Sequence, residues 1–89
     1  MSANFTKEDM LMEAAKLGRY DYVSRLLDDG ADIHAGGNEA LGEAISAGHL
    51  DVVKMMIRRG ADLFNLKENW IVWVGSKEMN DYLLGISNV

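Results

Sequence analysis

The sequence feature that most constrains the fold is a glycine-bounded segment that occurs twice, thirty positions apart. Residues 18–32 and 48–62 each start with glycine, continue with a helical spacing of apolar residues and end in Gly-Ala-Asp. Internal repetition with a period of about 20 to 50 residues is typical of proteins that stack small structural units. Because one such unit cannot bury its own apolar face, we expect neighbouring units to pack on one another.

Two antiparallel helices separated by a glycine are predicted in the first unit. Thr6 and Asp9 have the spacing of a capping pair that opens the first helix. Gly18 can supply the left-handed conformation that ends it. A second helix is expected over residues 20–28, until Gly30 stops it. The apolar residues expected on the buried faces of these two helices are Met10, Leu11, Ala14, Ala15, Val23, Leu26 and Leu27.

The second unit repeats this pattern after a segment rich in turn-forming residues. Residues 31–38 are expected to form an extended, finger-like loop, with Asn38 placed to cap the next helix. That helix is predicted to end at Gly48 and its partner to end at Gly60, before a second finger at residues 61–65. The apolar residues expected to be buried here are Leu41, Ala44, Ile45, Val53, Met56 and Ile57.

A divergent third unit is expected at the end of the chain. Gly75 takes the place of Gly18 and Gly48, because Leu83 and Leu84 follow it at the spacing of the earlier apolar pairs. Gly85 is expected to end the last helix. The sequence therefore predicts one domain of three units, with approximate boundaries at residues 6–35, 36–65 and 66–89.

The composition excludes several classes of function. The chain has 89 residues and no cysteine, which excludes disulfides and thiolate chemistry. Its net charge of −5 argues against a surface that binds the phosphate backbone of nucleic acid. It contains neither a run of 18 apolar residues nor the features of a signal peptide. We therefore expect a cytoplasmic protein with no cofactor that binds neither nucleic acid nor a membrane.

The repeated units resemble those of ankyrin-repeat proteins. The likeness lies in residues 44–54 and in Gly-Ala-Asp at 60–62, echoed at 14–18 and 30–33. The sequences of these units are similar to those of short repeats from large DNA viruses, phages and some bacteria. The resemblance implies an all-α solenoid of about three stacked helix pairs with short finger loops. It also implies a concave surface, formed by the fingers and first helices, that binds other proteins and carries no catalysis.

Trp70 and Trp73 are the sharpest candidates for a binding role. They stand five and two residues before Gly75. The same offsets in the first two units give polar residues that we expect to face solvent on the concave side: Glu13, Lys16, Glu43 and Ser46. Tryptophans on such a face are typical interface anchors. Alternatively, the divergent unit is rotated and the two indoles seal the end of the stack.

The fingers add two further candidates. Phe64 and His34 lie in these loops and could extend the binding surface, although Phe64 could equally pack beneath its finger. His49 is expected to be held by backbone hydrogen bonds, and two histidines without cysteine do not have the spacing of a metal site. Asp28-Asp29 and Arg58-Arg59 occupy equivalent positions, which predicts stacking of opposite charges rather than an arginine patch for an acidic partner.

We predict a non-enzymatic protein-binding module, since the glycines at 30, 36 and 37 lack the context of a phosphate-binding loop. The module would inhibit or scaffold a protein partner, as a viral or phage factor that acts on a host enzyme. The alternative is an acidic mimic of nucleic acid that blocks a nuclease or a DNA-binding protein. Three units are barely enough for a solenoid, so a homodimer through an exposed end is a further expectation.

Overall fold

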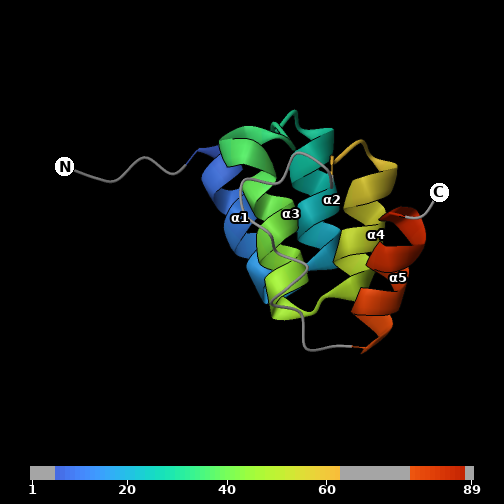
Figure 1. Ribbon diagram of the computed structural model, residues 1–89. Helices are drawn as coiled ribbons and strands as arrows, with labels where there is room; N and C mark the ends of the chain where they lie inside the picture. Colours follow the sequence, from blue (N-terminus) through green and yellow to red (C-terminus); the bar gives the residue numbers. More distant parts are fainter. Residues whose placement is uncertain (1–5, 63–76, 88–89) are drawn as a thin grey trace.

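Five helices make up the part of the chain that the structure, a computed structural model, describes, which is residues 6–62 and 77–87. Within those residues there is no β-strand, as Figure 1 shows. The helices are α1 (Lys7–Leu17), α2 (Tyr20–Asp28), α3 (Ala35–Ala47), α4 (Leu50–Arg58) and α5 (Lys77–Ser87).

The helices stack as repeated antiparallel pairs. α1 packs against α2 within the first pair, α3 packs against α4 within the second, and the pairs meet through α1 with α3 and α2 with α4. α5 lies beside α4 (Figure 1), where the Lys54 ammonium sits 5.3 Å from the centre of the Tyr82 ring. The arrangement is the all-α repeat stack that the sequence predicts. The boundaries of the units at residues 6–35, 36–65 and 66–89 stay predictions.

Local signals define the ends of the helices as expected. The hydroxyl oxygen of Thr6 accepts from the Asp9 amide at 3.1 Å, and the Asp9 carboxylate accepts from the Thr6 amide at 3.2 Å. α1 and α3 end at Gly18 and Gly48, whose φ angles of 73° and 81° are left-handed. The prediction that α2 spans residues 20–28 is confirmed.

The core contains most of the predicted apolar residues and several others. Among the described positions, the expected residues are buried except Met10, Leu27 and Ile57, which are half-buried. Val52 and Met55 of α4 are also buried, with 0% and 4% of their surface exposed. α4 lies between α2 and α5 (Figure 1), so more of its circumference is covered than one amphipathic face predicts.

Two expectations about helix ends are wrong. α3 begins at Ala35, so the predicted loop at 31–38 is shorter and Asn38 does not cap the helix. Asn38 has a φ of 65° and is only 3% exposed, and its side-chain oxygen accepts from the Asp62 amide at 3.2 Å. Gly85 does not end the last helix, because α5 continues to Ser87. Glycine weakens a helix interior but does not forbid it.

The predicted stacking of opposite charges is confirmed for one pair. Arg59 at the end of α4 donates to the Asp28 carboxylate at 2.7 Å and to the Ser24 hydroxyl at 3.2 Å. The two ionic side chains are 35% and 63% exposed. Solvent therefore screens the pair, and its contribution to stability is small.

We expect a double-mutant cycle with Asp28→Asn and Arg59→Gln to give a coupling energy of about 0 to 1 kcal/mol. The coupling should shrink as salt is added, because the pair is partly exposed. Urea unfolding of the two single variants and the double variant measures it. A coupling energy unaffected by salt would contradict a screened surface pair.

Candidate functional site

The first helices of the two pairs present a polar surface to solvent. Glu13 and Lys16 of α1 are exposed, Ser46 of α3 is exposed, and Glu43 of α3 is half-buried. These are the four positions that the register of the repeat placed together. α1 packs directly against α3, so the four side chains belong to one continuous face, which we call the inner surface.

Leu17 adds an apolar residue that the sequence analysis missed. It follows Glu13 by one helical turn and is 55% exposed, although large aliphatic side chains elsewhere on α1 are covered. Residues four apart share one face of a helix, so Leu17 lies with Glu13 on the inner surface. A register comparison could have found it, because its counterpart in the second unit is Ala47, which is also exposed.

Each finger is held by the first helix of its own unit. The Asp32 amide donates to the Glu8 carboxylate at 2.8 Å, and the Asp62 amide donates to the Asn38 side-chain oxygen at 3.2 Å. The two donors are thirty residues apart, and so are the two acceptors. The repeat therefore preserves the position of this bond while the acceptor changes from a carboxylate to an amide.

Both histidines bind backbone oxygens of a neighbouring unit. The His34 ring nitrogen Nε2 is 2.9 Å from the Gly60 carbonyl oxygen, and the His34 amide donates to Asp32 at 2.9 Å. The Nε2 atom of His49 is 3.0 Å from the carbonyl oxygen of Lys16. His49 is thus held by the backbone as predicted. The His34 side chain connects the first finger to Gly60, just before the second finger, and is still 53% exposed.

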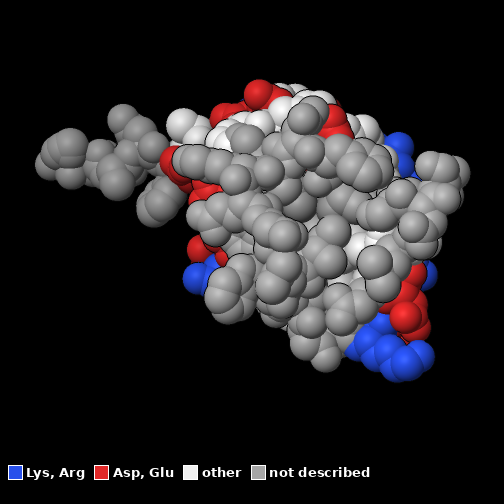
Figure 2. All heavy atoms as spheres, viewed as in Figure 1, with Lys and Arg blue, Asp and Glu red and all other residues white. Residues whose placement is uncertain are grey.

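Three of the predicted binding residues, Phe64, Trp70 and Trp73, lie outside the described residues. On the face seen in Figure 2, acidic side chains gather along the upper edge and beside α1. The described basic side chains on that face lie in separate spots rather than in one continuous patch.

The described ranges do not contain three acidic or histidine side chains grouped so that they could hold a metal ion. None of the helices within 6–62 and 77–87 is long and apolar enough to cross a membrane.

Stacked helix pairs, short fingers and a solvent-facing surface of first helices define a helical-repeat protein. A family model described as "Ankyrin repeats (3 copies)" matches residues 2–66, which is more than half of the chain. The chain belongs to the ankyrin-repeat family. A comparison with curated proteins found no match. Ankyrin repeats generally act as protein–protein interaction modules without enzymatic activity.

Proposed function

We propose that this chain binds a protein partner through its inner surface, with Leu17 as one apolar anchor. The observation that carries the proposal is the exposure of Leu17, 55% of whose surface is open to solvent. Glu13 and Lys16 flank it on the same helix and could form a polar rim around an apolar contact. Because almost half of this side chain is already covered, covering the rest with a partner contributes about 1 to 1.5 kcal/mol.

The remaining predicted residues extend this surface in the proposal. Ser46 and Glu43 continue it across α3, and His34 is an exposed side chain of the first finger. From the sequence alone, we add Trp70 and Trp73, by their register in the repeat, and Phe64, by its place in the second finger, as aromatic anchors. Aromatic anchors surrounded by polar residues are typical of the centre of a protein–protein interface.

The proposed role is inhibition or scaffolding of the partner. The resemblance to short viral, phage and bacterial repeats favours a factor that acts on a host enzyme in the cytoplasm. We also propose that a homodimer can form through an exposed end of the stack, which light scattering on the purified protein would test. The alternative function is an acidic mimic of nucleic acid, which the net charge of −5 supports.

Affinity capture with Leu17→Asp tests the proposed surface. The protein is used to capture partners from a cell extract, and the affinity of an identified partner is then measured with purified components. We expect Leu17→Asp to weaken binding by about tenfold or more, because a buried unpaired carboxylate opposes the interface. Trp70→Ala and Trp73→Ala should weaken binding as strongly or more.

Arg58→Ala is the control, since Arg58 is exposed at the end of α4 and away from the inner surface. Circular dichroism and thermal unfolding should show that all variants keep their fold. Capture that Leu17→Asp and the tryptophan variants leave intact would reject the inner surface. A steep loss of affinity with salt, together with dependence on carboxylates and not on these apolar residues, would favour the nucleic-acid mimic.

A further inference from the structure

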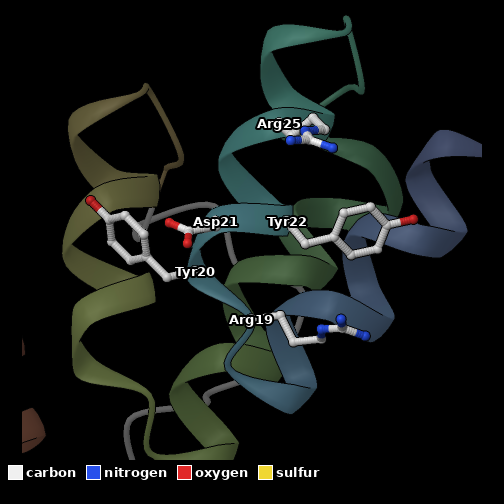
Figure 3. Close-up of a pocket in the computed structure, with 5 residues that line it drawn as sticks. All are labelled: Arg19, Tyr20, Asp21, Tyr22 and Arg25. Atoms are coloured by element: carbon white, nitrogen blue, oxygen red, sulfur yellow. The ribbon is translucent and has the colours of Figure 1, made fainter.

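The outer helix of the first pair carries an arginine–tyrosine–arginine ridge. Arg19, the residue that precedes α2, is followed at intervals of three residues by Tyr22 and Arg25 within the helix. The two arginine α-carbons are therefore about 9 Å apart along the helix axis. In Figure 3, Arg19 and Tyr22 extend to the same side and Arg25 lies further along the helix. Tyr20 and Asp21 extend to the opposite side, toward α4.

The equivalent residues of the second unit show how these three positions are used when a neighbouring unit packs on them. Their counterparts thirty residues later are His49, Val52 and Met55. Val52 and Met55 are buried, and the His49 ring binds the Lys16 carbonyl of the preceding unit. In α2 the same positions hold two exposed arginines and a half-buried tyrosine. The ridge therefore lies on a face that the repeat otherwise uses for packing.

The ridge is partly ordered by contacts within the chain. The guanidinium of Arg19 lies 5.5 Å from the centre of the Tyr22 ring, and the Tyr22 hydroxyl donates to the sulfur of Met10 at 3.3 Å. In the described part of the chain, neither Arg19 nor Arg25 forms an ion pair with a carboxylate. Arg59, by contrast, is 2.7 Å from the Asp28 carboxylate.

The ridge borders an open cavity of about 690 Å³. Its described lining residues are Arg19, Tyr20, Asp21, Tyr22 and Arg25. Two guanidinium groups that form no ion pair with the described carboxylates concentrate positive charge at one place on a chain of net charge −5. Tyrosine and arginine are also the residue types enriched where proteins bind one another. A face that only contacts water needs polar residues of any kind, and lysine or glutamate would serve there equally well.

We infer that the Arg19–Tyr22–Arg25 ridge is a second interaction surface, separate from the inner surface, which binds an acidic segment of a protein. Each guanidinium can donate two parallel hydrogen bonds to one carboxylate. The tyrosine ring between them can receive an apolar side chain. The fitting segment carries two carboxylates on one face with an apolar residue between them, as a helix does with Glu, Leu and Glu at positions i, i+3 and i+7.

Nucleic acid fits this surface poorly. Two guanidinium groups are few for a phosphate backbone, whose binding needs many cationic contacts. Asp21 also lines the cavity, and Asp29 is exposed just after the end of the same helix. These carboxylates would repel a continuous row of phosphates, whereas a short acidic segment can place its charges at the two arginines.

Fluorescence anisotropy with a labelled helical peptide that carries the Glu-Leu-Glu pattern tests the inference. The matched probe replaces each glutamate of the peptide by glutamine. At physiological ionic strength we expect the full chain to bind the acidic peptide at least about tenfold more tightly than its neutral counterpart. The double variant Arg19→Gln/Arg25→Gln should lose about tenfold or more of that affinity. Arg19→Lys/Arg25→Lys should recover only part of it, because lysine lacks the planar fork.

The charge-matched control is Arg58→Gln/Lys77→Gln, which removes two exposed positive charges outside the ridge. It should change the affinity by less than about twofold, since distant exposed charges are screened. Leu17→Ala, which changes the inner surface without adding a charge near Arg19, should leave peptide binding unchanged, so this surface can be tested even if the proposed inner surface fails. Thermal unfolding confirms that each variant is folded.

Four results would overturn the inference. They are equal binding of the neutral peptide, full affinity in the folded Gln double variant, an equal loss in the charge-matched control, and tighter binding of a DNA oligonucleotide at the same arginines. Sedimentation supplies a further test: a dimer that dissociates when Arg19 and Arg25 are changed would assign the ridge to contact between two copies of this chain.

Discussion

Replacing Gly18 by alanine should lower the free energy of unfolding by about 2 to 4 kcal/mol, whereas Gly48→Ala should lower it by only about 1 kcal/mol. Both glycines end a first helix in the left-handed conformation, with φ angles of 73° and 81°. The backbone strain introduced by alanine is therefore similar at the two sites. The expected difference must come from what surrounds each position.

The surroundings of the two glycines differ because His49 packs on Gly18. A β-carbon at Gly18 would lie 2.5 Å from Nδ1 of the His49 ring, whereas one at Gly48 would meet no atom within 4 Å. The ring cannot simply move away, because its Nε2 atom is bound to the Lys16 carbonyl oxygen at 3.0 Å. Alanine at position 18 would then break this bond between units or displace the whole second pair.

Urea unfolding of Gly18→Ala, Gly48→Ala and His49→Ala, followed by the double variant Gly18→Ala/His49→Ala, measures the effect. With the imidazole removed, alanine at position 18 should cost about 1 kcal/mol, as it does at position 48. Equal destabilisation by the two glycine substitutions in the presence of His49 would show that the ring does not restrain Gly18.

Ile45→Ala should destabilise the protein by about 3 to 5 kcal/mol, because it removes a fully buried aliphatic side chain. Ile45 is 0% exposed on α3, the helix that packs against both α1 and α4. A domain of this size has a total stability of roughly 4 to 9 kcal/mol. We therefore expect the variant to lose about half or more of its stability, seen as a much lower urea midpoint and melting temperature.

Leu17→Ala is the matched control for this experiment. It deletes a similar aliphatic side chain, but Leu17 is 55% exposed, so the change should alter stability by less than about 0.5 kcal/mol. The comparison separates the core of the stack from the proposed binding surface. If the two variants lost similar amounts of stability, the described burial of α3 would be wrong.

Much of the fold could be predicted from local signals in the sequence. The ends of α1 and α2 depend on a capping box at Thr6 and on glycines with a left-handed conformation, and these act within a few residues of the chain. The thirty-residue period then implied that the second pair copies the first. The exposure of Glu13, Lys16 and Ser46 followed from the same register.

The register by itself could not say which neighbouring unit each side chain meets. Asn38 looked like a helix cap, yet it is buried beneath the second finger because α3 begins earlier than its glycines suggest. Arg59 pairs with Asp28 and not with its counterpart Asp29, although both aspartates are exposed. The sequence does not distinguish Leu17 from the buried apolar residues of α1, and only the structure shows that it is exposed.

The sequence alone determined the class of this protein, because the repeat period and the positions of its glycines impose helix pairs that must stack to bury their apolar faces. The tertiary structure decided which faces stay open to partners. Arg19, Tyr22 and Arg25 occupy positions that pack on the preceding unit in the second unit, whereas in the first unit the two arginines are exposed and the tyrosine is half-buried. Whether such a position is buried or exposed depends on how the helices stack, because the burial of a side chain is set by the neighbouring unit as well as by its own unit.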